Sequence, residues 1–210
     1  MFKHIIFDFD GVIINSHEVQ LKALTESFAA ICGDGIPPYD DFFSHSGDSL
    51  ANIFRLLGLP IEMIPVYHQI SRDNIGLIKI HKGMLELLEK LNETGYICSL
   101  CTGKDRNRTI EILKWLNMEH LFKVVVCSDD VVNPKPHPES LIFIIKKVGY
   151  PTDNTIMIGD GINDIISAEK ANIKSIAVTW GDLPVNEIIK SGPTFVAHSV
   201  PELMFILDIK

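Results

Sequence analysis

The sequence predicts an α/β fold: a doubly wound parallel sheet with a small all-helical cap domain inserted after the first strand. From residue 82 onward, short apolar runs alternate with helical stretches, the order that a parallel sheet covered by helices requires. The apolar runs are continuous, which is typical of strands buried on both faces. Residues 15–81 show helical periodicity without a strand-like run. We therefore expect a core domain over 1–14 and 82–210 and a cap domain over 15–81.

The first strand is expected over residues 5–12, where isoleucine, phenylalanine and valine favour an extended backbone. In the insert, apolar residues at helical spacing predict three helices, with Ser16 as the N-cap of the first. These helices cover residues 16–31, 50–57 and 61–78. The glycines and prolines of residues 32–38 predict a loop between the first two.

In the core, the same criteria predict an alternation of helices and strands up to the end of the chain. The expected elements are helix 83–92, strand 96–101, helix 105–116, strand 123–127, helix 139–148, strand 154–159, helix 162–171, strand 175–179, helix 185–191, strand 194–197 and helix 201–207.

The composition restricts the possible partners. Hydrophobic residues make up 46% and charged residues 22%, as in ordinary globular proteins. The net charge of −8 argues against a nucleic-acid surface. The apolar runs are too short to cross a bilayer, and Asp8 and Asp10 interrupt what would be the apolar region of a signal peptide. We expect a cytoplasmic protein, a monomer or weak homodimer, that binds neither nucleic acid nor membrane.

The four cysteines do not predict a disulfide framework. Cys98 and Cys101 have CxxC spacing but lie in an expected strand, where residues three apart face opposite sides. A shared metal or an easy disulfide is therefore disfavoured, and we expect buried, reduced thiols.

Polar residues follow four of the expected strands. Because ligands of open parallel sheets bind beyond the carboxyl ends of the strands, these residues are candidates for chemistry. Two like charges at the end of a buried strand are costly unless a cation or a shared proton relieves them. The candidates are Asp8 and Asp10 at the end of the first strand, Thr102, Gly103 and Lys104 after the second, Lys135 in a proline-rich loop after the third, and Asp160 and Asp164 after the fourth.

Together these pieces resemble the signature motifs of the haloacid dehalogenase-like superfamily, and especially its phosphoglycolate phosphatase-like members. Asp8-Phe9-Asp10-Gly11-Val12 matches the first motif, Thr102 the second, Lys135 the third, and Asp160 with Asp164 the fourth. The resemblance implies a Rossmann-like core with a cap. Residues 33–38, 56–60 and 179–181 are also similar to phosphatases associated with 3-amino-5-hydroxybenzoate synthesis, a weaker resemblance.

The resemblance implies a phosphatase that hydrolyses a small phosphorylated metabolite, phosphoglycolate or a sugar-phosphate-like compound, through an aspartyl-phosphate. Asp8 would be the nucleophile, and Asp10 the acid that protonates the leaving group and then the base that activates water. The remaining roles are phosphate binding by Gly11, Thr102 and Gly103, and charge balance on the nucleophile and phosphate by Lys135.

The implied cofactor is Mg²⁺, since oxygen ligands and a phosphate suit a hard cation. By the same resemblance its site would comprise Asp8, the backbone carbonyl of Asp10, Asp160 and, orienting them from nearby, Asp164. Asp164 is also placed to cap the helix that follows.

Other reactions of the superfamily remain open alternatives. A beta-phosphoglucomutase-type phosphomutase commonly carries Glu-Asp in the fourth motif, where this chain has Gly159-Asp160. A dehalogenase would lack Asp10, and a phosphonate hydrolase would need a cap lysine, for which Lys22 is a candidate. A non-catalytic binding protein on the same fold is the alternative from another class.

Several residues near the motifs have no assigned role. His17 and Lys22 are candidates for substrate contact from the insert, while Lys104 and Arg106 are expected at the surface, at a helix start. Asp129 and Asp130 are expected in a solvated loop. Asn15 precedes Ser16 where many members have an aspartate, which removes a charge near the hinge of the cap.

Overall fold

The computed structural model describes residues 2–45 and 47–209. Six strands form one parallel sheet in the order β5-β4-β1-β6-β7-β8. The central strand β1 (His4–Phe7) pairs with β4 (Ile97–Cys101) on one side and with β6 (Thr155–Gly159) on the other. The predicted doubly wound parallel sheet is confirmed. The outer strands are β5 (Val124–Val126), β7 (Lys174–Val178) and β8 (Phe195–Ala197).

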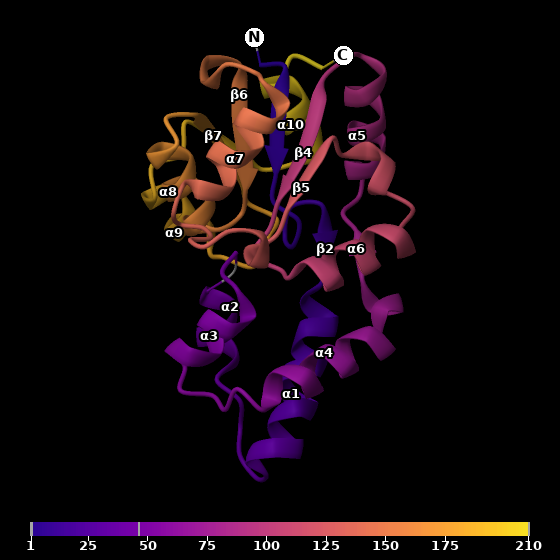
Figure 1. The fold of residues 1–210 in the computed structure, drawn as a ribbon, viewed down its shortest axis with the longest axis vertical. Coiled ribbons are helices and arrows are strands. Elements are labelled where there is room, and N and C mark those ends of the chain that lie inside the picture. The colour runs from indigo at the N-terminus through magenta and orange to yellow at the C-terminus, as the bar shows by residue number, and fades with distance from the viewer. Residues whose placement is uncertain (1, 46, 210) are drawn as a thin grey trace.

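Helices cover both faces of this sheet (Figure 1). One face packs against α5 (Met84–Glu93), α6 (Arg106–Trp115) and α10 (Val200–Ile206). The other packs against α7 (Glu139–Val148) and α8 (Ile162–Lys170), beside which lies α9 (Val185–Lys190). Because alternate strand residues point to opposite faces, Cys98 and Cys101 lie in different hydrophobic clusters. Both are buried and free, as predicted.

An insertion that contains four helices among its described residues follows the first strand and forms a second body below the sheet (Figure 1). The helices are α1 (His17–Cys32), α2 (Tyr39–Ser44), α3 (Leu50–Leu56) and α4 (Met63–Asp73), and we call them the cap. The cap has its own hydrophobic cluster, built around Leu24, Phe42, Phe54, Met63 and Tyr67. The predicted helical insertion is confirmed, whereas the exact domain limits, 1–14 with 82–210 and 15–81, stay a prediction.

A short antiparallel ribbon connects the cap to the core. It pairs β2 (Ile14–Asn15) with β3 (Lys79–Ile80). The prediction that residues 15–81 contain no strand is therefore wrong at both ends of the insert, because a two-residue strand is too short to show alternation. The helix predicted to run to Ile78 ends at Asp73, followed by a 3₁₀ turn at Ile75–Leu77.

Apart from the first strand, which ends earlier than predicted, the remaining helices and strands agree with the predicted ranges to within a few residues at each end. Helix α2 was not predicted, since its six residues span less than two turns and follow two prolines. Three further 3₁₀ turns lie in the core, at Glu119–Leu121, Ser128–Asp130 and Thr152–Asn154. No helix among the described residues combines the length and apolarity that crossing a bilayer requires.

Candidate active site

The carboxyl ends of three adjacent strands bring Asp8, Thr102 and Asp160 together. Each residue directly follows its strand, β1, β4 or β6, and each side chain is buried. The first strand is shorter than predicted and ends at Phe7. The chain then turns at Gly11, whose φ is +74°. A Cβ at Gly11 would lie 2.0 Å from Asp160 Oδ2, so glycine is required for these two strand ends to approach.

Lys135 reaches this point from the loop after β5. Its Nζ lies 3.0 Å from Asp8 Oδ1 and 2.5 Å from Asp164 Oδ1, and it donates to the Cys101 carbonyl at 3.0 Å. Burial acts to lower the pKa of Lys135, but the charges of Asp164 and Asp8 outweigh it and raise the pKa. The lysine therefore stays charged and links Asp8 to Asp164.

Asp164 uses both of its oxygens. While Oδ1 pairs with Lys135, Oδ2 accepts the Gly161 backbone N–H at 3.0 Å, at the N-terminus of α8. The carboxylate thus caps its helix, as the sequence suggested, and at the same time orients Lys135.

The site holds more buried negative charge than its lysine can balance. One carboxylate oxygen from each of Asp8, Asp160 and Asp164 lies within 4.8 Å of the others. Burial, together with Asp164, raises the pKa of Asp8 to about 7 against the effect of Lys135. Burial and the charges of Asp8 and Asp164 likewise raise the pKa of Asp160. Among the described residues, Asp160 Oδ1 has no hydrogen-bond partner, so this oxygen set fits a hard divalent cation.

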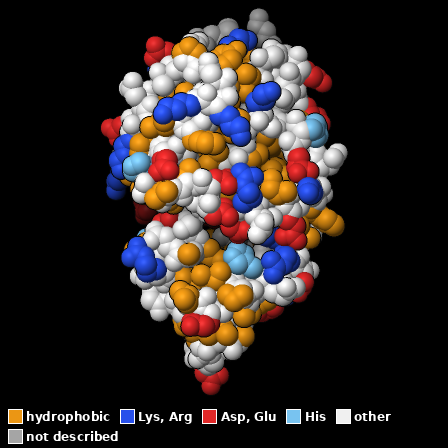
Figure 2. Space-filling model, in the orientation of Figure 1, with side chains coloured by type: hydrophobic (Ala, Val, Ile, Leu, Met, Phe, Trp, Pro, Cys, Tyr) orange, Lys and Arg blue, Asp and Glu red, His pale blue; other side chains and the backbone are white. Residues whose placement is uncertain are grey.

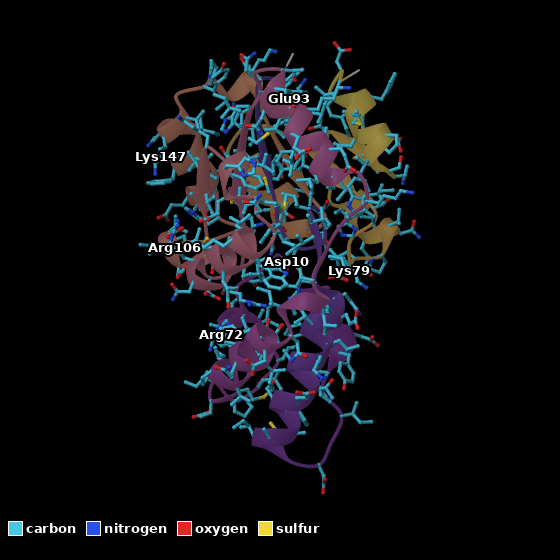
Figure 3. All side chains as sticks on the ribbon, turned by 90° about the vertical axis from the view of Figure 1, so that its right-hand side faces the viewer. Asp10, Arg72, Lys79, Glu93, Arg106 and Lys147 are labelled. Atoms are coloured by element: carbon cyan, nitrogen blue, oxygen red, sulfur yellow. The ribbon has the colours of Figure 1, made fainter. Side chains whose placement is uncertain are left out.

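Asp10 occupies a different environment, at the junction of core and cap (Figure 3). Its Oδ1 accepts the Ser16 hydroxyl at 2.5 Å and lies 3.4 Å from Gln20 Nε2, while its Oδ2 lies 3.2 Å from Lys104 Nζ. Ser16 occupies the predicted N-cap position of α1, but its side chain makes no capping bond and binds Asp10. The expectation that Lys104 is a surface residue is wrong: its side chain is 18% exposed and faces Asp10.

Thr102 and Gly103 form the edge of the core that meets the cap. Thr102 is buried, and its hydroxyl oxygen accepts the backbone N–H of Lys104 at 3.1 Å. A Cβ at Gly103 would lie 2.5 Å from the Gly47 carbonyl oxygen and 2.6 Å from that of Asp48. The cap loop therefore rests directly on the backbone at Gly103.

A pocket of about 70 Å³ lies between core and cap and reaches Asp8 and Asp10. The core contributes Thr102, Gly103, Lys104, Asp105 and Arg108 to its wall, and the cap contributes Gln20, Phe42, Phe43, Gly47, Asp48, Leu50, Ile53, Tyr67, His68 and Ser71. Figure 2 shows acidic and basic side chains gathered in the region where the core and the cap meet.

Residues 5–178 match a family model described as haloacid dehalogenase-like hydrolase. The chain belongs to this family. Along the chain, the matched residues run from β1 to β7. They include the carboxyl ends of β1, β4 and β6, where Asp8, Thr102 and Asp160 lie. It confirms the family that the four motifs indicated and the prediction that the chain is an enzyme.

Individual relatives cover almost the whole chain. Pyrophosphatase PpaX from Halalkalibacterium halodurans is 28% identical over 209 residues, which are 98% of this chain and 97% of the relative. A phosphoglycolate phosphatase from Agrobacterium fabrum is 29% identical over 198 residues, 87% of this chain and 84% of the relative. The solved structure of a hydrolase from Pseudomonas syringae has a TM-score of 0.87 at 23% identity, over 98% of both chains. At that identity, the structural likeness shows the fold alone.

Several candidate residues of this hydrolase lie outside the pocket. His17 Nδ1 is 2.8 Å from Asp182 Oδ1, and the His17 ring stacks on Phe43 at 4.1 Å, so it joins cap and core at the side of the pocket. Lys22 pairs with Glu26 on the surface of α1. In the described part of the chain, Phe43 lines the pocket, whereas His17 and Lys22 do not.

At the start of the loop after β5, Asp129 and Asp130 lie away from the carboxylate cluster, unlike Lys135 further along the same loop. Arg106 Nε and Nη2 each lie 2.5 Å from the carboxylate of Asp130, and the Arg106 backbone N–H donates to Asp129 at 2.8 Å. Both aspartates, expected in a solvated loop, are therefore held by Arg106 at the start of α6. They supply no oxygen to the carboxylate cluster of the described residues.

Proposed function

We propose that this chain is a Mg²⁺-dependent phosphatase that hydrolyses a small phosphorylated metabolite through an aspartyl-phosphate at Asp8. The observation that carries the proposal is the position of Asp8. It lines the pocket, is held 3.0 Å from Lys135 Nζ, and shares a buried oxygen cluster with Asp160 and Asp164. A carboxylate that is buried at the carboxyl end of a central strand and faces an open pocket is well placed to attack phosphorus.

In the first step an Asp8 oxygen attacks phosphorus, forming the new P–O bond as the ester P–O bond breaks. Asp10 donates a proton to the leaving oxygen in this step. In the second step water attacks the aspartyl-phosphate, Asp10 takes a proton from that water, and phosphate leaves with Asp8 regenerated. Ser16 and Lys104 hold the Asp10 carboxylate in one orientation throughout.

The other predicted site residues bind and neutralise the phosphoryl group in this proposal. Lys135 balances the charge of Asp8, and the Thr102 hydroxyl and Gly103 amide donate to phosphoryl oxygens. The close turn at Gly11 lets the backbone approach the phosphate. Asp8, the Asp10 carbonyl and Asp160 would hold Mg²⁺, with Asp164 beside them. When bound, the ion neutralises the carboxylates and polarises the phosphoryl oxygens.

The fourth motif supports a phosphatase over a beta-phosphoglucomutase-type phosphomutase. A Cβ at Gly159 would lie 2.2 Å from Asp164 Cβ, so the Glu-Asp form of the motif does not fit this arrangement. A non-catalytic binding protein would be expected to have lost part of the Asp8, Lys135 and Asp160 constellation, which is complete here.

The similar relatives suggest substrates. They are called pyrophosphatase and phosphoglycolate phosphatase, so we propose pyrophosphate and phosphoglycolate, alongside sugar phosphates, as substrates to test first. A small pocket suits compounds of this size.

Hydrolysis of p-nitrophenyl phosphate should require Mg²⁺ and stop when a chelator removes it. The apparent affinity for Mg²⁺ should also decrease as the pH is lowered. Because the metal-free Asp8 has a pKa of about 7, Mg²⁺ must displace a proton below that pH. The dissociation constant, measured by calorimetry and from the Mg²⁺ dependence of the rate, should rise up to about tenfold per unit below neutrality.

Chelator-resistant turnover, or a dissociation constant that does not change with pH, would contradict this assignment of the metal site. Product analysis separates the alternatives: free phosphate indicates a phosphatase, whereas an isomerised sugar phosphate formed with a bisphosphate activator indicates a mutase. No metal-dependent turnover across a broad panel of phosphate esters would leave the non-catalytic alternative.

Substituting Gly103 by alanine should lower kcat/KM by about 100-fold without unfolding the protein, since small misplacements at an active site have effects of this size. The added methyl group would collide with the backbone carbonyls of Gly47 and Asp48, so the cap loop would have to move away from the core. Gly76→Ala is the matched control, because its Cβ would meet nothing within 4 Å. Wild-type kinetics in Gly103→Ala would show that contact between this loop and the core is not needed.

A further inference from the structure

Arg108 is a buried arginine in the pocket wall with an unused donor. It lies in the first turn of α6 and is 4% exposed. Its Nη1 donates to Glu111 Oε2 at 2.8 Å, and its Nη2 donates to the Ser71 carbonyl at 2.6 Å. Its Nε is buried and, among the described residues, has no hydrogen-bond partner. Because an unpaired buried N–H is costly, this donor calls for an acceptor from a ligand.

Two polar side chains of cap helix α4 line the pocket near this guanidinium. Burial raises the pKa of Tyr67 and lowers that of His68, and the charge of Arg108 acts to lower both. Both rings are therefore within electrostatic reach of Arg108. A phenol and an imidazole add hydrogen-bonding groups to this part of the wall.

Other charges on the wall already have partners. Lys104 Nζ lies 3.2 Å from Asp10 Oδ2 and is paired with that carboxylate. The Asp48 carboxylate accepts the Asn52 side-chain N–H at 2.5 Å. Of the arginines and lysines that line the pocket in the described part of the chain, Arg108 is the one with a buried donor left unpaired.

We propose that Arg108 binds a second anionic group of the substrate, a carboxylate or a phosphate, while the phosphoryl group to be cleaved lies at Asp8. This inference rests on the proposed function, because it takes Asp8 as the reacting end of the pocket. Guanidinium groups pair well with both anions. The hydrogen bond from Arg108 to the Ser71 carbonyl joins core helix α6 to cap helix α4. An anion bound to Arg108 would therefore lie between the core and the cap.

The test compares kcat/KM for 2-phosphoglycolate and pyrophosphate, which carry a second anionic group, with that for p-nitrophenyl phosphate, which does not. Arg108→Met should lower kcat/KM for 2-phosphoglycolate, for pyrophosphate or for both by about 100-fold, mainly through KM, as for the loss of a charged hydrogen bond. The loss for p-nitrophenyl phosphate should be at least about tenfold smaller, because a shared effect on folding or closure acts on all substrates alike.

Arg106→Met is the matched control. Arg106 is two residues away on the same helix, but its guanidinium pairs with Asp130 outside the pocket. Its kinetics should equal those of the wild type for every substrate. If Arg108→Met does not fold, Arg108→Lys keeps the charge without the Nε donor, and should show the same selective loss to a smaller degree.

Equal losses for substrates with and without a second anionic group would overturn the inference and make Arg108 a structural link to Ser71. It would also be overturned if the wild-type enzyme hydrolysed p-nitrophenyl phosphate but neither 2-phosphoglycolate nor pyrophosphate. Absence of Mg²⁺-dependent p-nitrophenyl phosphate hydrolysis is a different failure, that of the proposed function itself. Selective loss for pyrophosphate identifies the second group as a phosphate, and selective loss for 2-phosphoglycolate identifies it as a carboxylate.

Discussion

Asp8→Asn is expected to lower kcat by about four orders of magnitude or more while leaving the fold intact, because the amide cannot form the phospho-enzyme. Asparagine has nearly the same shape as aspartate and removes one of the crowded negative charges. Since burial and Asp164 raise the pKa of Asp8 to about 7, the ionised carboxylate costs free energy in the metal-free protein. We therefore expect the thermal midpoint of the metal-free variant to equal or exceed that of the wild type.

The measurement combines steady-state kinetics with thermal unfolding in the presence of a chelator. Asp153→Asn is the matched control, because Asp153 is exposed in the 3₁₀ turn before β6, at the end of the sheet opposite the pocket. It should retain wild-type kcat. Near-wild-type turnover by Asp8→Asn would show that another group is the nucleophile, and loss of folding would show that Asp8 has a structural role.

Lys135→Met should have a large effect on stability as well as on activity. The substitution leaves Asp8 and Asp164 buried without their shared cation. Removing one partner of a buried ion pair typically costs about 3–5 kcal/mol, so we expect the free energy of unfolding to fall by about that amount in the absence of metal. We also expect kcat/KM to fall by at least about 1000-fold, since the lysine balances charge at the reacting centre.

Urea denaturation in the presence of a chelator measures this loss. Without Lys135, the pKa of Asp8 should rise further, and a raised carboxyl pKa makes the folded state less stable as the pH increases toward that pKa. The variant should therefore be more stable at acidic than at slightly alkaline pH. Adding Asp164→Asn should restore part of the stability, because it removes one of the uncompensated charges. A loss below about 1 kcal/mol would contradict the idea that Lys135 neutralises these carboxylates.

The centre of the site could be predicted from sequence because its residues directly follow buried strands. Asp8, Thr102 and Asp160 each lie one residue beyond an apolar run, and parallel order places such positions at the same sheet edge. Lys135 was identified through its rigid proline-rich loop and its place in the motif order. The sequence could not show that its Nζ joins Asp8 to Asp164, since that contact depends on how three separate segments pack.

The surroundings of Asp10 were harder to predict. Ser16 and Lys104 both lie at helix starts, where capping and solvent exposure are the ordinary roles of such residues. Their contacts with Asp10 arise because the β2–β3 ribbon brings the start of α1 beside the end of β4. Those two-residue strands leave no periodic signal, so neither contact could be foreseen.

Arg108 was missed for a related reason. In the sequence it is one of three basic residues within five positions, Lys104, Arg106 and Arg108, and helical spacing alone does not say which of them faces the cap. The structure separates them: Arg106 binds Asp130 at the surface, Lys104 faces Asp10, and Arg108 lines the pocket. The position of the cap determines which of these three side chains faces the pocket, and no local sequence pattern predicts that position.

The central claim is that the phosphoryl group passes through Asp8, and trapping it there is the most direct test. A single-turnover reaction with Mg²⁺ and substrate is quenched in acid and treated with borohydride, which reduces an acyl phosphate to the alcohol. Peptide mass spectrometry should then find homoserine at position 8, and only when both substrate and Mg²⁺ were present. Turnover without this conversion, or conversion at Asp10 instead of Asp8, would contradict the account.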